Sequence, residues 1–169
     1  MANTRLLLDR MARLMQAGAW ARGLNPAQAS ALAYLARANR FSRSPSHVAD
    51  YLGTTRGTAS QTLQALARKG LVQADPSWAD RRSVSYRVTA QGRSADETEA
   101  LPPGLSSPEQ ATLDHLLERM ARGLTAGGRS FGLCASCTYH RPGPACALMQ
   151  IALAPEEAHQ LCHEHQPAG

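Results

Sequence analysis

Four cysteines in the last third of the chain have a spacing that suits metal binding. They are Cys134, Cys137, Cys146 and Cys162, which gives the pattern C-x2-C-x8-C-x15-C. Two thiolates separated by two residues can bind one ion from a single tight turn, and a second pair can complete a tetrahedral site. The pattern therefore predicts a structural zinc ion held by four sulfur atoms.

Other chemistries remain open for the same cysteines. A set of four thiolates can also hold an iron–sulfur cluster, which would make the protein a redox or iron sensor. Alternatively, Cys134 and Cys137 can form a regulatory disulfide, or all four can be unrelated buried thiols. His163 follows Cys162 directly and could replace one cysteine as a ligand, whereas His140 and His165 are expected to lie in solvent.

A second group of chemically useful side chains lies on one predicted helix. A helix that enters the major groove of DNA needs compact or hydrogen-bonding side chains, such as Gln for adenine and Arg for guanine. Ala59, Leu63 and Leu66 are expected to face the core of such a helix. The candidate DNA-binding residues beside them are Thr55, Arg56, Thr58, Ser60, Gln61, Thr62 and Gln64.

The segments on either side complete a winged helix-turn-helix. Ser44-Pro45 predicts the start of a short helix that stops at Gly53, and Thr54 or Thr55 can cap the next one. Residues 71–74 and 84–88 predict the strands of a hairpin. The tip of this hairpin carries Arg81 and Arg82, which suit contact with phosphate.

Several of these segments occur in the order found in one protein family. They are residues 24–28, residues 46–53, residues 66–72 with their Gly-Leu-Val end, Asp80-Arg81-Arg82, and residues 88–92. Over about residues 5–125 the chain resembles MarR-type transcriptional regulators. The resemblance implies a homodimer with interlocked terminal helices, a recognition helix in the major groove and a wing along the minor groove. It also implies that Arg81 and Arg82 reach phosphate or the minor groove while Asp80 holds a guanidinium.

The chain departs from that family in several places. Gln73-Ala74-Asp75 stands where the family commonly has a basic residue, and Pro102-Pro103 interrupts the region expected to form the dimer. Relatives that respond to ligands bind small aromatic anions, so a small-molecule effector is a possible partner. Trp20, Tyr34 and His47 either line such a crevice or pack in the core.

The expected fold class is mainly α with a small β-hairpin wing. The expected domains are an N-terminal dimerisation helix (1–24), a winged helix-turn-helix DNA-binding domain (25–93), C-terminal dimerisation helices (94–128) and a separate four-cysteine metal-binding module (129–169). Apolar stripes support a homodimer, because they are too hydrophobic for lone surface helices. The stripes comprise Leu7, Met11, Leu14 and Met15, and Leu113, Leu116, Leu117 and Met120.

Charge and hydropathy narrow the function further. The net charge is +5, but residues 1–93 carry +10 and residues 94–169 carry −5, as expected for a protein that binds double-stranded DNA. The longest apolar run, Ala31 to Ala36, is too short for a membrane span, so a cytoplasmic protein is expected. No catalytic constellation stands out, which favours a non-enzyme. A thiol-disulfide oxidoreductase and a zinc-stabilised protein-interaction adaptor remain as alternatives.

Overall fold

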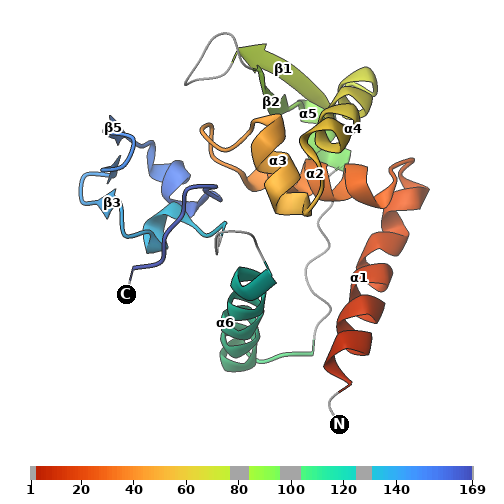
Figure 1. The fold of residues 1–169 in the computed structure, drawn as a ribbon, viewed down its shortest axis with the longest axis horizontal. Coiled ribbons are helices and arrows are strands. Elements are labelled where there is room, and N and C mark those ends of the chain that lie inside the picture. Colours follow the sequence, from red (N-terminus) through yellow and green to blue (C-terminus); the bar gives the residue numbers. More distant parts are fainter. Residues whose placement is uncertain (1–2, 77–83, 96–103, 125–130, 169) are drawn as a thin grey trace.

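The computed structural model describes residues 3–76, 84–95, 104–124 and 131–168. Its first part is a winged helix, and small strands and 3₁₀ helices follow near the C-terminus (Figure 1). The α-helices and the hairpin are α1 (Thr4–Ala21), α2 (Pro26–Arg37), α3 (Pro45–Leu52), α4 (Arg56–Arg68), β1 (Val72–Pro76), β2 (Val84–Val88), α5 (Ala90–Ala95) and α6 (Ser107–Leu124). The later elements are η2 (Cys134–Ser136), β3 (His140–Arg141), β4 (Ala145–Cys146), β5 (Ile151–Ala152) and η3 (Pro155–His159). The predicted fold class, mainly helical with a hairpin wing, is confirmed.

Polar caps set the start of α2, α3 and α4. Asn25 accepts a hydrogen bond from the backbone N–H of Gln28 at 2.8 Å, and the Gln28 side chain accepts one in return. Ser44 caps α3 and Thr55 caps α4 in the same way. Gly53 ends α3 with a φ of +61°, a left-handed conformation that glycine adopts without strain. These caps fix the corner between α3 and α4.

The core of the winged helix lies between α2, α3 and α4. Leu32, Leu35 and Leu63 are fully buried there, and Val48 joins them from α3. The hairpin is antiparallel, with Val72 opposite Val88 and Pro76 opposite Val84. Its base is tied to the helices, since the N–H of Leu71 donates to the carbonyl of Leu66. The wing is therefore an extension of the helical core.

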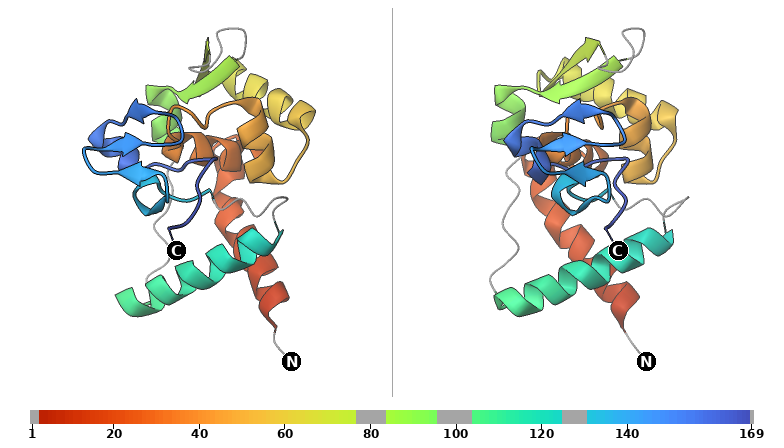
Figure 2. Two further views of the ribbon diagram at one scale, coloured as in Figure 1. Left: turned by 60° about the vertical axis from the view of Figure 1, so that its left-hand side comes forward. Right: turned by 90° about the vertical axis from the view of Figure 1, so that its left-hand side faces the viewer.

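Helices α1 and α6 project from the same end of this core (Figures 1 and 2). Their predicted apolar stripes are present but lie largely in solvent, and α6 has no buried residue at all among those described. Leu14 and Met15 are 60% and 57% exposed. No helix in the described ranges has the length and hydropathy that a membrane crossing requires. In the single chain, the apolar faces of α1 and α6 are therefore exposed to solvent.

The C-terminal segment packs against the winged helix. Leu161 bridges to Ala38 beside the end of α2, and its backbone N–H donates to the carbonyl of Arg37 at 2.8 Å. Phe131 is buried in the main core, where its ring meets the edge of Tyr34. The segment has few apolar side chains of its own, so it is stabilised by packing on the winged helix.

Residues 154–157 also predict the start of a helix with Cys162 in its last turn, and the structure has this start but an earlier end. A helix does begin at Pro155, where the side chain of Glu157 accepts a hydrogen bond from the Ala154 N–H. It is a 3₁₀ helix that ends at His159, and Gln160 is extended. Cys162 therefore lies beyond the helix and not in its last turn, because the chain must extend for Leu161 to bond with the backbone of α2.

Candidate nucleic-acid interface and cysteine pocket

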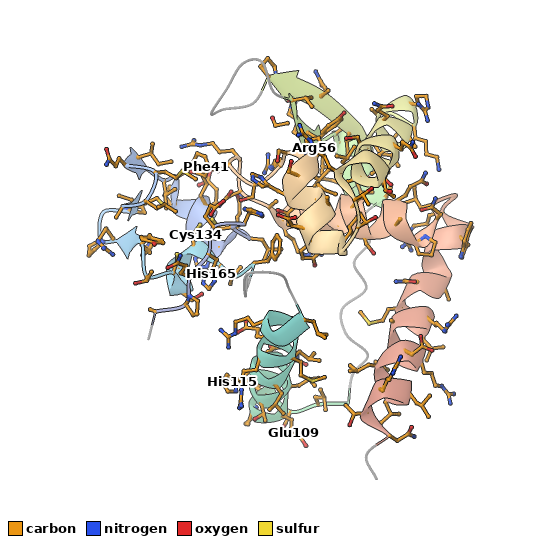
Figure 3. The ribbon with its side chains drawn as sticks, viewed as in Figure 1. Phe41, Arg56, Glu109, His115, Cys134 and His165 are labelled. Atoms are coloured by element: carbon orange, nitrogen blue, oxygen red, sulfur yellow. The ribbon has the colours of Figure 1, made fainter. Side chains whose placement is uncertain are left out.

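Helix α4 presents a polar face to solvent. Ala59, Leu63 and Leu66 are buried as predicted, so the opposite face is free for a ligand. Arg56 stands at the start of the helix (Figure 3). Of the candidate DNA-binding residues, Ser60 and Thr62 are half-buried, and those exposed to solvent are Thr55, Arg56, Thr58, Gln61 and Gln64.

The hydroxyl of Thr55 caps the start of α4. It accepts a hydrogen bond from the backbone N–H of Thr58 at 3.1 Å and lies 2.9 Å from the Thr58 hydroxyl. Both threonines therefore fix the start of α4 whether or not they also meet DNA. Among the described residues, no hydrogen bond of this kind involves the side chains of Arg56, Gln61 and Gln64.

The wing carries an ion pair that the sequence interpretation missed. Arg87 on β2 donates to Asp75 on β1 at 2.6 Å and to the side chain of Gln73 at 2.9 Å. Residues 73–75 depart from the family pattern, and here they hold this arginine on the hairpin. The pairing of β1 with β2 could have indicated this contact, because its register places Gln73 opposite Arg87. Arg81 and Arg82 lie outside the described residues, as do Asp80 and Trp78.

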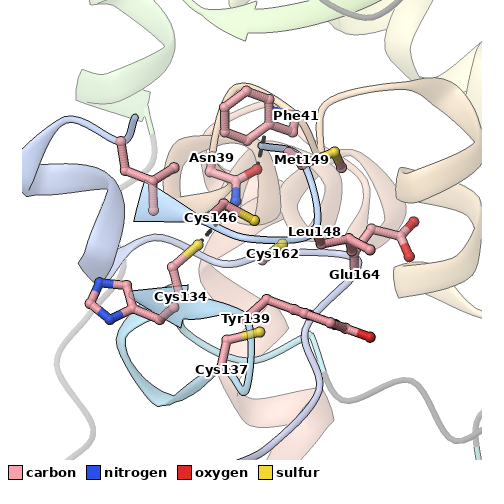
Figure 4. A pocket seen from close by; sticks show the side chains of 12 residues that line it. Asn39, Phe41, Cys134, Cys137, Tyr139, Cys146, Leu148, Met149, Cys162 and Glu164 are labelled. Atoms are coloured by element: carbon pink, nitrogen blue, oxygen red, sulfur yellow. Dashed lines mark hydrogen bonds between the residues drawn. The ribbon is translucent and has the colours of Figure 1, made fainter. Parts of the chain in front are cut away.

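All four cysteines line one pocket between the C-terminal segment and the connection that follows α2 (Figure 4). They come from η2, its C-cap, β4 and the extended chain after η3. Asn39 and Phe41 enter the pocket wall from the winged helix. The four thiols form no disulfide. The fold therefore brings the predicted ligands together, with their sulfur atoms spread around the pocket wall.

Two of the cysteines are coupled by a hydrogen bond. The thiol of Cys134 donates to Cys162, which lowers the pKa of Cys162 to about 6 and raises that of Cys134. Asn39 is fully buried, and its Nδ2 donates to Cys134 Sγ at 3.4 Å. Its Oδ1 accepts the N–H of Phe41 at 3.1 Å. Hydrogen bonds of this kind stabilise thiolates, the form in which cysteine binds metals.

The histidines are not arranged as expected. His140 lies in the pocket wall, and its Nε2 is buried without a hydrogen-bond partner among the described residues. His165 is buried, with Nε2 at 3.0 Å from the Ser136 hydroxyl and its ring packed tightly on Gly132. The prediction that His140 and His165 lie in solvent is thus wrong. His163 lies outside the pocket lining, because its two ring nitrogens face Asp50 and Glu164 at 2.8 Å each.

The three residues considered for an effector crevice lie in different environments. Tyr34 is part of the core, where its hydroxyl donates to the carbonyl of Ser42 at 2.7 Å and its ring stacks on Tyr51. Trp20 is 65% exposed, and His47 is half-buried with its ring against His163. The sequence left open whether Tyr34 lines a crevice or packs in the core, and the structure places it in the core.

Comparison with known proteins supports the fold. Residues 22–83 match the sequence model of the MarR family. No match was found among curated proteins. The DNA complex of MepR from S. aureus is similar at 21% identity, covering 72% of this chain and 95% of that one with a TM-score of 0.55.

Two further structures are similar over most of their length. FabT of Streptococcus pneumoniae in complex with DNA has 23% identity, with 72% of this chain and 94% of that one covered and a TM-score of 0.53. CouR of Rhodococcus jostii RHA1 bound to p-coumaroyl-CoA has 18% identity, with coverages of 70% and 92% and a TM-score of 0.56. At these identities the likeness shows a common winged-helix fold.

The contacts of Asn39 yield a stability prediction. Asn39→Leu keeps the approximate size of the side chain but removes the donor to Cys134 and the acceptor for the Phe41 N–H. Leaving a buried polar group unpaired costs about 1–3 kcal/mol, so the free energy of unfolding should fall by that amount in urea titrations. Gln64→Leu is the control, since a change at this exposed position should stay within about 0.5 kcal/mol. Equal stability of the two variants would contradict an anchoring role for Asn39.

Proposed function

The chain carries a MarR-type winged helix, and we propose that it is a sequence-specific DNA-binding transcriptional regulator that acts as a homodimer on a near-palindromic operator. The observation that carries this proposal is the polar face of α4, held by a capped corner after α3 and followed by a hairpin wing. In such an arrangement the second helix enters the major groove. DNA is bound in the complexes of MepR and FabT, which share the fold.

The charge distribution supports the same partner. Residues 1–93 carry a net charge of +10, and DNA binding gains free energy when such charges displace counterions from phosphate. Phosphate contacts position the protein, and base contacts from α4 select the sequence. Gln61 and Gln64 are suited to adenine and Arg56 to guanine. Arg81 and Arg82 on the wing would supply phosphate or minor-groove contacts.

The uncovered faces of α1 and α6 support dimerisation. Both carry leucine and methionine side chains at helical spacing that remain exposed in the single chain. Burial of apolar surface contributes about 25 cal/mol per Å², so a two-fold partner covering both helices would be favoured. The dimer would place its two recognition helices about one DNA turn apart.

We propose that the cysteine pocket binds a structural zinc ion. Four cysteine sulfur atoms in one pocket are a donor set that zinc takes, and Asn39 donates a hydrogen bond to one of them, Cys134. Cys134, Cys137, Cys146 and Cys162 would hold the ion, which would stabilise a segment that has little core of its own. An iron–sulfur cluster or a thiol switch is the alternative occupant of the same pocket.

We further propose a regulatory, non-enzymatic role. A small-molecule effector is compatible with the fold, since CouR carries p-coumaroyl-CoA. A thiol-disulfide oxidoreductase is disfavoured, because Cys134 begins a 3₁₀ turn that Cys137 caps, and no strand of a βαβ unit precedes this turn among the described residues. An adaptor that binds only proteins would have little use for the glutamines and arginine exposed on α4.

Gln61→Ala tests the DNA face. The change removes a base-edge contact, so it should weaken binding to the best selected duplex by about 1–3 kcal/mol and alter which sequence is preferred. Gel-shift titrations at several salt concentrations measure both effects. Gln110→Ala, at a half-buried glutamine on α6, is the control and should leave affinity unchanged. If Gln61→Ala behaves like that control, α4 is not the recognition helix.

Leu117→Glu tests the dimer. A charge on the apolar face of α6 would have to be buried in the interface, so the variant should sediment as a monomer at micromolar concentration while the unmodified chain sediments as a dimer. Ala111→Glu places the same charge on the opposite face of α6 and should leave the dimer intact. A monomeric unmodified chain would refute the dimer.

Cys146→Ser tests the metal site. Protein purified without oxygen should be colourless, and elemental analysis should find one zinc ion per chain. The Cys146→Ser variant should lose this ion, melt at lower temperature and bind DNA more weakly. Ala147→Ser adds the same hydroxyl at the exposed neighbouring position and should keep the metal. Brown protein would move the assignment to an iron–sulfur cluster. Metal retained at full occupancy in Cys146→Ser would remove this residue from the site.

A further inference from the structure

Two histidines and a glutamate meet where α3 touches the C-terminal segment. The candidate ligand atoms of His47, His163 and Glu164 all lie within 4.8 Å of one another. The rings of His47 and His163 are 4.1 Å apart, and His163 Nδ1 is 2.8 Å from Glu164 Oε1. His47 belongs to α3, whereas the other two residues follow Cys162. The cluster therefore joins residues far apart in the sequence.

Asp50 holds the imidazole of His163 from the other side. Its Oδ2 is 2.8 Å from His163 Nε2, and Asp50 lies one helical turn after His47 on α3. The other ring nitrogen, Nδ1, faces Glu164. A carboxylate that orients a histidine in this way is the usual companion of a histidine metal ligand.

Burial and charge suit a cation at this position. The His163 side chain is only 5% exposed, which fixes its orientation, whereas Asp50 and Glu164 are 47% and 42% exposed and leave a route from solvent. Two carboxylates beside two imidazoles give this position acceptor oxygen and nitrogen atoms that suit a cation. Imidazole and carboxylate ligands suit zinc, cobalt, nickel and copper.

We propose that His47, His163 and Glu164 bind a divalent transition-metal ion, with Asp50 as the hydrogen-bonding partner of His163. This site is distinct from the cysteine pocket, whose lining includes Glu164 but neither His47 nor His163. Its ligands come from both sides of the contact between α3 and the C-terminal segment. Bound metal would therefore clamp the helix that precedes the recognition helix onto that segment.

Cobalt titration of the full-length protein tests the proposal. The absorption spectrum of Co²⁺ bound by sulfur differs from that of Co²⁺ bound by nitrogen and oxygen. The unmodified chain should bind a Co²⁺ ion whose spectrum lacks sulfur-to-metal charge transfer, in addition to any ion in the cysteine pocket. Glu164→Gln preserves shape and His47→Gln removes the ligand on α3. Each substitution should lower the affinity for this Co²⁺ ion at least about tenfold, the loss typical of a disrupted metal site.

His115→Gln, at an exposed histidine of α6, is the matched control and should bind the ion as tightly as the unmodified chain. Circular dichroism confirms that each variant is folded, and the isosteric Glu164→Gln serves if His47→Gln unfolds. The proposal is overturned if the unmodified chain binds no Co²⁺ without sulfur ligation. It is equally overturned if a folded His47→Gln or Glu164→Gln protein retains full affinity, or if His115→Gln also loses the ion.

Discussion

The hydrogen bonds made by the connection between α2 and α3 hold the rest of the structure together. Asn39 bonds Cys134 and the backbone of Leu161, and the Ser42 hydroxyl accepts the N–H of His163 at 2.9 Å. The guanidinium of Arg43 donates to the carbonyl of Ala38, while the Arg43 carbonyl accepts the N–H of Tyr86 on the wing. One short polar connection therefore satisfies groups from α2, β2 and the C-terminal segment, and each group would be costly to bury unpaired.

This connection places the winged helix and the cysteine pocket in one mechanical unit. Aromatic contacts extend it, since Phe131 meets both Tyr34 and Tyr51, at 6.0 and 5.3 Å between ring centroids. Tyr51 is on α3, the helix that sets the angle of α4. Packed interiors transmit displacements because they have little free volume. A change at the pocket thus has a direct path of contacts to α3, the helix before α4.

Much of the winged helix could be predicted from local sequence, because caps and apolar spacing act over one or two helical turns. Asn25, Ser44 and Thr55 cap the helices as their residue types indicate, and Ala59, Leu63 and Leu66 are buried. The docking of Leu161 beside Ala38 could not be predicted, since backbone pairing over such a separation leaves no periodic signal. The burial of His165 was also missed, because its contacts with Ser136 and Gly132 join residues about thirty positions apart. The cysteine spacing indicated the pocket but not the wall that Asn39 supplies from the winged helix.

The C-terminal segment has two sources of stability that depend on each other. Its own apolar cluster comprises Cys134, Leu153 and Cys162, with Phe41 of the winged helix packed against it. Two of these three side chains are cysteines whose sulfur atoms line the pocket, so any ion bound there would also order the cluster. Asn39 contacts Cys134, and Ser42 contacts the residue after Cys162. Because the docking contacts and the cysteines are the same or adjacent residues, filling the pocket and attaching the segment to the winged helix must favour one another.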